Sequence, residues 1–329
     1  MSSVSPSQVP SLVTQMGYAP MLRAYADEPA VRQQVFAMVP VEGWEEGVDV
    51  MDVTGPVVPG EIKRGEASPH RTINETYRRV GLVRKLAESI TLQEEFLRNP
   101  NASALLGAKI GGWMAQMGKG FQIAKETYAA KFLNRGSISA GDILVFDGSH
   151  PGHADPYPKF IYDGKPFFAA SGAGHPNFFT SSTYVNQDAN ALSSTNLESA
   201  RVLMASTNAF NESDERIRID PNVLVVPPDL SRTARVLVNT TLLPGTAQND
   251  INTLQGQYAV IEWRYLTDTD GWFLGVRGQG VKIFDSGDPV INISEPDKAT
   301  GDITIRLISY HGGYVEDWRY WSAHATSTS

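Results

Sequence analysis

The longest regular pattern of apolar and polar positions in the chain runs from Asn101 to Gly136. Apolar side chains recur there at steps of three or four residues, which places them on one face of a helix; they are Leu106, Ile110, Trp113, Met117, Phe121, Ala124, Tyr128 and Phe132. The polar side chains between them are Lys109, Gln116, Lys119, Gln122, Glu126 and Lys131. The pattern predicts one amphipathic helix over residues 102–134, roughly 50 Å long. Because a small domain is only about 30 Å across, such a helix must brace a larger structure.

Five glycines interrupt the predicted helix: Gly107, Gly111, Gly112, Gly118 and Gly120. Each costs about 1 kcal/mol relative to alanine in a helix interior. Two explanations stay open: another backbone packs closely against these glycines, or they allow the helix to bend. At the C-terminal end, Lys131 and Arg135 complement the helix dipole, and Gly136 is expected to form a left-handed cap.

The segments before this helix have too few apolar positions to form a core of their own. Residues 1–45 contain five prolines and short helical pieces such as Ala30 to Met38, which is typical of an extended arm. Strands are predicted at Val48 to Val53 and again from Thr72 to Leu86, and a short helix is predicted near Leu92 to Leu97. The turn-rich, charged stretch between the two strands is too long for a hairpin turn and indicates a projecting two-stranded loop, with a disordered linker as the alternative.

The second half of the chain alternates between helices and strands. A helix is predicted over Asn196 to Thr207, and a short strand, Asn222 to Val226, is followed by two prolines and a helix from Asp229. The remaining predicted strands are Tyr258 to Leu266, Trp272 to Arg277, Val281 to Phe284, Val290 to Ile293, Asp302 to Tyr310 and Tyr314 to Trp321. These elements predict an α+β protein.

Composition limits what the chain can do. A length of 329 residues with 41% hydrophobic and 19% charged residues is enough for about two globular domains. Without cysteine there is no disulfide, thiolate or Cys-ligated zinc. The formal net charge of −8 argues against a broad nucleic-acid-binding surface. No apolar run reaches the roughly 18 residues of a membrane span, and no signal peptide is evident at the N-terminus.

Three stretches invite a catalytic interpretation, and each departs from the pattern it would need. Gly112 to Gly120 differs from a phosphate loop in its spacing and in lacking Ser or Thr after the lysine. His150 and His153, with Asp155, offer metal ligands, but Pro and Gly between the histidines favour a surface turn. Ser171 to His175 lacks the G-x-S-x-G elbow of a serine hydrolase. We therefore predict no catalytic site, no metal and no cofactor.

Aromatic residues cluster in the predicted C-terminal strands: Trp263, Tyr265, Trp272, Trp318, Tyr320 and Trp321. Such residues can form a platform for sugar rings. Their more common use is to pack in cores and interfaces, and this is the interpretation we favour.

The order of these parts resembles that of tailed-bacteriophage major capsid proteins, in particular the Mu-like major head subunit family. Individual segments carry the resemblance over about residues 45–321. Asp163 to Phe168 followed by His175 to Asn177 is similar to that family's "DGK-x-LF … HGN" segment, with Pro176 in place of Gly. Pro221 to Leu230 is similar to its "P-x-x-L-V-V-P-P-x-L" unit. Gly301 to Tyr310 and Val315 to Arg319 look like its closing strand pair.

The resemblance implies a specific division of the chain. Residues 1–45 correspond to an N-terminal arm, 46–80 to an extended loop, 81–185 to a peripheral domain built on the long helix, and 186–299 to an axial domain. Residues 300–329 correspond to C-terminal strands that return to the peripheral domain.

The implied function is structural. Subunits of this kind form pentamers and hexamers of an icosahedral head around double-stranded DNA, in a virion assembled in the host cytoplasm. The implied partners are other copies of the chain, a portal, separate scaffolding or decoration proteins, and the packaged DNA as a non-specific neighbour, with no membrane. An encapsulin-like compartment shell is the alternative with the same fold. A virion-associated hydrolase or sugar-binding β domain is the alternative from a different class.

The extended loop is expected to contact neighbouring subunits through four charged residues, Glu61, Lys63, Arg64 and Glu66. Some relatives join subunits covalently through a loop lysine and an asparagine. Lys63 is the only lysine of this loop, but no acceptor or catalytic glutamate can be assigned, so covalent cross-linking is not the favoured reading. The helix glycines, Gly107, Gly111, Gly112, Gly118 and Gly120, are expected to give the helix flexibility.

Overall fold

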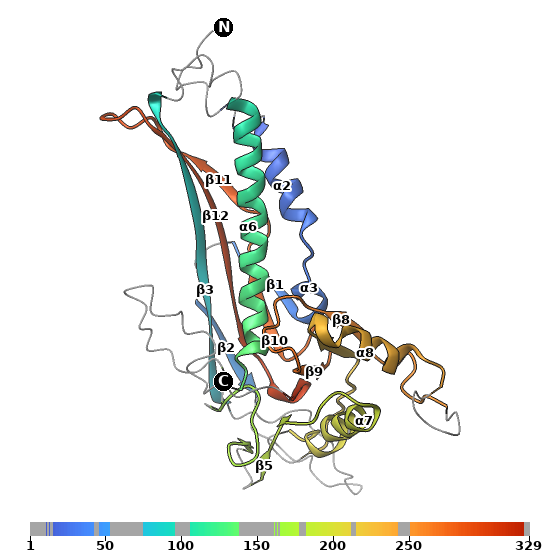
Figure 1. Cartoon of the computed structure of the whole chain (residues 1–329). Coiled ribbons are helices and arrows are strands. Elements are labelled where there is room, and N and C mark those ends of the chain that lie inside the picture. Colours follow the sequence, from blue (N-terminus) through green and yellow to red (C-terminus); the bar gives the residue numbers. More distant parts are fainter. Residues whose placement is uncertain are drawn as a thin grey trace, which may run out of the picture.

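The computed structural model describes most of the chain. The described residues are 11, 13, 16–42, 46–52, 75–95, 106–137, 161, 163, 165–177, 182–211, 215–242 and 251–325. For residues 46–52, 75–82 and 106–107 the description is limited to the backbone. Figure 1 shows one long helix standing between a shorter N-terminal helix and two long strands, with smaller elements at its lower end.

The long helix is α6, Leu106–Asn134, and it ends where the sequence predicts. Its 29 residues span roughly 43 Å, while residues 102–105 lie outside the described residues. The predicted left-handed cap at Gly136 is wrong, because Gly136 is not among the glycines with positive φ. Gly136 is small for another reason: a Cβ there would clash with the ring of Phe168, whose N–H donates to the Gly136 carbonyl at 2.8 Å.

The larger sheet carries the long helix on one of its faces. Its strands are β1 (Ala37–Pro40), β2 (Glu46–Asp52), β3 (Glu75–Leu92), β10 (Val281–Asp285), β11 (Val290–Ile293) and β12 (Ile303–Val315). They are ordered β1-β10-β12-β3-β2, and β11 also pairs with β12. The antiparallel pairing of β2 with β3 confirms the two-stranded base of the predicted loop. Residues 53–74, which form the rest of that loop, lie outside the described residues.

Two predictions about this sheet are wrong. The strand predicted to end at Leu86 continues to Leu92, because residues 82–92 of β3 pair with β12. The short helix predicted near Leu92 to Leu97 is represented by helical residues at Glu94 and Glu95, and residues 96–100 lie outside the described residues. The break predicted between Tyr310 and Tyr314 is absent, since β12 runs through it without interruption. Position 313 is a glycine because a side chain would not fit there, and not because the chain turns: a Cβ would be 2.7 Å from the Lys282 carbonyl oxygen.

The second sheet separates two helices from the long helix. Its strands are β6 (Gln187–Asp188), β13 (Trp321–His324), β9 (Trp272–Gly275), β7 (Val223–Val226) and β8 (Ala259–Glu262), in that spatial order. The helices are α7 (Ser194–Val202), which continues as a π-helix over Leu203–Thr207, and α8 (Pro228–Asn239). Both helices and the strand, Pro-Pro, helix unit confirm the predictions. The predicted strand Tyr258 to Leu266 is shorter, and the predicted strand Tyr314 to Trp321 is replaced by the end of β12 and a 3-10 helix, Trp318–Tyr320.

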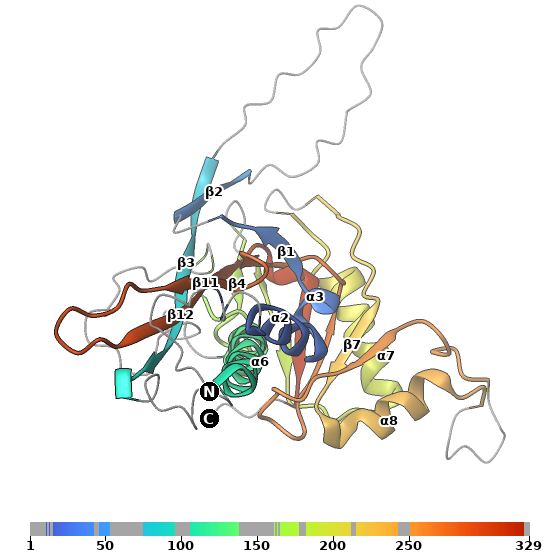
Figure 2. The same cartoon turned by 90° about the horizontal axis from the view of Figure 1, so that it is seen from above.

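The described part of the predicted arm lies on the rest of its own subunit. Helix α2 (Tyr18–Asp27) packs along α6, as Figures 1 and 2 both show. The helix predicted over Ala30 to Met38 is only α3 (Arg32–Val35), because Ala37 onward pairs in parallel with β10. The short strands β4 (His175–Pro176) and β5 (Thr183–Tyr184) form a separate two-stranded sheet.

Two hydrophobic cores follow one another along α6. Around its first half, Ile110, Met114 and Met117 pack with α2 and with the first residues of β12. Around its second half, Tyr128, Phe132 and their neighbours pack against both sheets at once. A third core lies between the second sheet and helices α7 and α8. The long helix thus joins the two sheets, as a brace between separate cores would.

Candidate functional site: the long helix and its contacts

Helix α2 contacts α6 at glycines. A Cβ on Gly118 would clash with the carbonyl oxygen of Met21, and one on Gly111 would lie 3.2 Å from the carbonyl oxygen of Met16. Gly17, just before α2, is equally confined, since its Cβ would lie 3.0 Å from Met114 Cγ. Gly111 and Gly118 are seven residues apart and therefore share a face of α6. Close backbone packing explains these two glycines.

The other helix glycines have different surroundings. A Cβ on Gly112 or Gly120 would meet no atom within 4 Å. Gly107 lies in the first turn of α6, where the surroundings of side chains are not described. Packing therefore gives no reason for Gly112 and Gly120, and the prediction that they serve flexibility stays a prediction.

Buried charges join the arm, the long helix and the larger sheet. Arg32 of α3 donates to Glu126 Oε1 at 2.8 Å and to Asp285 Oδ2 at 2.6 Å. Lys125 Nζ lies 2.6 Å from Asp285 Oδ1 and 3.0 Å from the hydroxyl of Tyr25. The side chains of Arg32, Lys125 and Glu126 are at most 1% exposed. We call these five residues the arm–helix cluster.

The cluster balances two cations against two carboxylates. Burial alone would raise the pKa of Asp285, but contacts with Lys125 and Arg32 outweigh burial and lower that pKa. Burial raises the pKa of Glu126, because Arg32 is its only cationic partner in the cluster. Trp263 Nε1 also donates to Glu126 Oε2 at 3.0 Å, which extends the cluster to the loop after β8. The second half of α6 is thereby held to three separate segments.

Sequence periodicity did not reveal this cluster. It placed Gln122 and Glu126 on the polar side of the helix, whereas both are buried, at 2% and 0% exposure. The second half of α6 is enclosed by two sheets and has no wide solvent-facing side. One signal was present: Lys125 lies four residues after Phe121 and three before Tyr128, within the apolar stripe.

His311 of β12 lies beside the cluster and makes an edge-on ring contact with Tyr128, with ring centroids 4.5 Å apart. Burial, reinforced by the charge of Lys125, lowers the pKa of His311 to about 3. The imidazole is therefore neutral at neutral pH.

The residues of the rejected serine-hydrolase motif are structural. His175 Nδ1 lies 2.6 Å from Asp163 Oδ2, and its ring stacks on Trp318 with centroids 4.1 Å apart. Both Asp163 and His175 have side chains at 0% exposure. Ser171 lies in an exposed turn, and no described contact joins it to His175. The pair links two parts of the predicted capsid motif, "DGK" and "HGN", across a loop.

A second histidine, His324, contacts an aspartate and a serine in the same order as the histidine of a catalytic triad does. His324 Nδ1 lies 2.8 Å from Asp188 Oδ1, and His324 Nε2 lies 2.9 Å from Ser322 Oγ. Ser322 is 0% exposed and its hydroxyl is 3.3 Å from the sulfur of Met204. A nucleophile must reach its substrate, so this arrangement supports the position of β13 rather than chemistry.

The aromatic cluster belongs to the cores. Trp263, Trp272, Trp318 and Trp321 are each at most 1% exposed, and Tyr265 and Tyr320 pack against them partly buried. The prediction of core packing is confirmed, and a sugar platform built on these rings is wrong because a ligand could not reach them.

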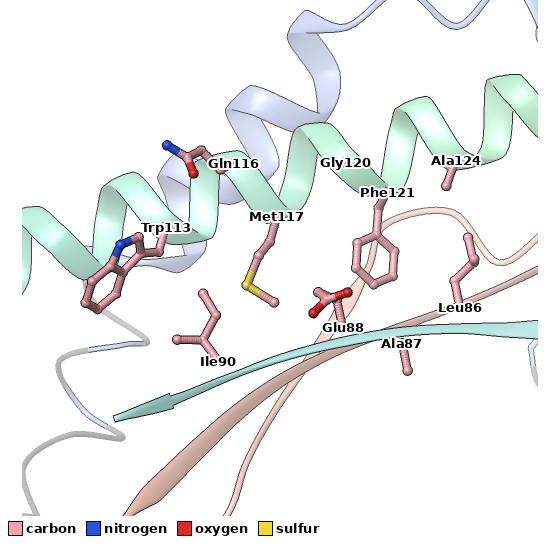
Figure 3. Close-up of a pocket in the computed structure, with 10 residues that line it drawn as sticks. All are labelled: Leu86, Ala87, Glu88, Ile90, Trp113, Gln116, Met117, Gly120, Phe121 and Ala124. Carbon is pink, nitrogen blue, oxygen red and sulfur yellow. The ribbon is translucent and has the colours of Figure 1, made fainter. Parts of the chain in front are cut away.

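A groove of about 390 Å³ lies between α6 and β3, and Figure 3 shows the residues that line it. Trp113, Met117 and Phe121 form its helix side, with Gly120 between them. Leu86 and Ile90 project into it from the strand, together with Glu88. The groove is open and mainly apolar.

Several predicted site residues lie outside the described residues. They are the loop residues Glu61, Lys63, Arg64 and Glu66, and the turn residues His150, His153 and Asp155. Within the described part of the chain, no three His, Cys, Asp or Glu side chains are grouped so that they could hold a metal ion. No helix among the described residues is long and apolar enough to cross a membrane.

The long helix lies along two of the three cores, and buried ion pairs of the arm–helix cluster hold its second half. Among protein families, the model described as "Phage capsid protein" matches residues 110–322. This match covers most of the chain, from α6 to β13, and the chain therefore belongs to the phage capsid protein family. The protein is a structural capsid subunit of a phage head, and the match favours neither a compartment shell nor a hydrolase nor a sugar-binding domain. No curated protein sequence matches the chain.

Solved structures similar to the chain include the capsid of one particle and two phage structures. "Capsid of native GTA particle computed with C5 symmetry" is 16% identical, with 90% of each chain covered and a TM-score of 0.49. Mycobacterium phage Patience is 12% identical, with 97% of this chain and 88% of that chain covered and a TM-score of 0.48. Microbacterium phage Oxtober96 is 12% identical, with 88% of each chain covered and a TM-score of 0.47. These values are too low to transfer any residue, contact or partner to this chain.

Proposed function

We propose that this chain is the repeating subunit of an icosahedral tailed-phage head and assembles into pentamers and hexamers around double-stranded DNA. The observation that carries the proposal is the family match over residues 110–322. The geometry supports it, because α6 ties two sheets and the described part of the arm into one braced subunit. A subunit of this kind can transmit load across a shell without a catalytic centre.

The Mu-like family is our proposal for the branch to which the chain belongs. Its support is local: Asp163 and His175 contact each other, and Pro221 to Leu230 folds as a strand, a proline pair and the start of a helix. The departure at Pro176 is physically tolerable, because Pro176 lies in a two-residue strand and pairs with Thr183 alone. We also propose the division into arm, extended loop, peripheral domain, axial domain and returning C-terminal strands at the boundaries given above.

We propose that the loop beyond the β2–β3 base contacts neighbouring subunits through Glu61, Lys63, Arg64 and Glu66. Exposed ion pairs contribute only about 0 to 1 kcal/mol each. A closed shell repeats the contact at every subunit, so the sum can still be large. Portal, scaffolding and decoration proteins are proposed partners, packaged DNA a proposed neighbour, and the host cytoplasm the proposed place of assembly.

Expression of the chain alone or with a scaffolding protein from the same phage tests the shell proposal. Sedimentation and negative-stain microscopy should show closed particles of uniform size. A protein that stays monomeric in both cases, at millimolar and micromolar concentration and over a range of salt, would contradict it.

A further inference from the structure

Among the described residues, only the first part of the outer edge of β3 is paired with another strand. Strand β2 pairs with the first part of β3, and this pairing ends at Leu82. From Val83 to Leu92, β12 occupies one edge of β3, and no strand among the described residues pairs with the other. Figure 1 shows β3 at the margin of the sheet. An open strand edge presents main-chain donors and acceptors that another strand can pair with.

The groove beside this edge adds side-chain contacts. Figure 3 shows Leu86, Glu88 and Ile90 pointing toward α6, whereas Ala87 points away. Leu86 and Ile90 are half-buried and belong to the margin of the core around the first half of α6. A strand added to the edge would gain main-chain hydrogen bonds and could place alternate side chains over the groove, as in β-augmentation.

The charged residues along this edge are complementary to the same residues of a second copy of the strand. Arg84 lies two residues before Leu86 and Glu88 two residues after it, so all three share one face of the strand. When two identical antiparallel strands are related by a two-fold axis, a residue a given number of positions before the axis in one strand faces the residue the same number of positions after the axis in the other strand. With the axis at Leu86, each Arg84 lies opposite the Glu88 of the other copy. An axis at Lys85 or at Glu88 would instead place like charges opposite each other.

We propose that β3 pairs edge to edge with β3 of a second copy, antiparallel, across a two-fold axis at Leu86. Charged residues on edge strands normally oppose pairing. Here they select one partner and one register. The proposal rests on the proposed shell function, since a closed shell of rings needs contacts between rings, and two-fold axes lie where two rings meet.

The chain has no cysteine, which makes a cross-linking test direct. In the proposed pairing the two Leu86 Cβ atoms lie about 4.5 to 5.5 Å apart, close to the separation that a disulfide requires. Leu86→Cys should therefore form covalent dimers under mild oxidation. In Thr91→Cys, the matched control on the same strand, the two cysteines lie roughly 33 Å apart and should stay unlinked.

Particle formation by the unsubstituted protein is scored first, by sedimentation, and tests the shell function alone. Most Leu86→Cys subunits should then cross-link within particles. Fewer than about one-tenth of Thr91→Cys subunits should cross-link, and adding Glu88→Arg to Leu86→Cys should lower the yield of cross-linked dimers several-fold. Because Leu86 lines the groove, a mixture of Lys85→Cys and Ala87→Cys proteins provides a second test at exposed positions that lie opposite each other in the pairing.

Three results would overturn the edge pairing while leaving the shell function intact. In the first, normal particles contain only monomeric Leu86→Cys and the mixture also fails to cross-link. In the second, Leu86→Cys is unlinked but protected from alkylation, which means that another segment covers the edge. In the third, Thr91→Cys cross-links as well as Leu86→Cys, which means that contact is not specific.

Discussion

Two glycines of the long helix provide a matched pair for testing how α2 is held. At Gly118 an added Cβ would clash with the backbone of Met21, whereas at Gly112 it would meet nothing within 4 Å. Both residues lie in the interior of α6, so Gly→Ala carries the same gain in helix propensity at each site. Any difference between the two variants therefore reports the contact with α2.

The expected difference in the free energy of unfolding follows from two contributions, helix propensity and the fit of the added methyl group. Gly112→Ala should stabilise the subunit by about 1 kcal/mol from propensity alone. Gly118→Ala gains the same amount but forces a backbone carbonyl to move, and overpacking of this kind costs about 1 to 3 kcal/mol. Met21, which is 0% exposed, moves with that carbonyl. We expect Gly118→Ala to be less stable than Gly112→Ala by about 1 to 3 kcal/mol.

Urea unfolding of the unassembled subunit, followed by fluorescence of the buried tryptophans, measures this difference. Gly120→Ala is the second control, because its Cβ would also meet no atom within 4 Å. Equal midpoints for Gly118→Ala and Gly112→Ala would refute the claim that α2 packs against a glycine surface. A Gly118→Ala variant that is more stable than the unsubstituted protein would refute it as well.

Four further predictions follow from the same structure. Gly112→Ala with Gly120→Ala should stabilise the subunit by about 1 to 2 kcal/mol yet slow any change in shell size; particles that mature at the normal rate would leave these glycines without a role in bending. Asp285→Asn leaves two buried cations short of a partner and should cost about 3 to 5 kcal/mol in urea unfolding, whereas Asp297→Asn, at an exposed turn, should cost far less. The pKa of His311 is about 3 in the folded protein and 6.5 in the unfolded chain, so the unfolded chain takes up a proton at a higher pH than the folded protein does. The free energy of unfolding therefore has its full value above pH 6.5 and falls by up to roughly 5 kcal/mol toward pH 3, and His311→Phe should flatten that part of the pH profile. Replacing residues 54–71 by a Gly-Ser turn should leave the circular dichroism of the subunit unchanged while particles fail to form or dissociate in moderate salt, and salt-resistant particles of normal size would contradict the loop contact.

The local pattern of apolar, polar and proline residues was sufficient to predict the elements that are determined by residues close together in the sequence. The long helix ends where its apolar period ends, and the unit from Val223 to Asn239 folds as predicted because Pro227 and Pro228 terminate a strand and open a helix. The resemblance of segment order to phage capsid proteins likewise needs no coordinates, and the family match confirms it at that level.

Tertiary structure decided which faces meet, and that is where prediction from sequence failed. Glu126 fits a polar helix face by its period, but two sheets enclose that part of α6, so the carboxylate is buried and must be paired with Arg32. Gly313 fits a turn by its residue type, but β12 continues through it because Lys282 leaves no room for a side chain. Periodicity describes one segment at a time, whereas burial, pairing and crowding depend on residues that are distant in the sequence, such as Arg32, which lies 94 positions before Glu126, and only the folded chain brings them together.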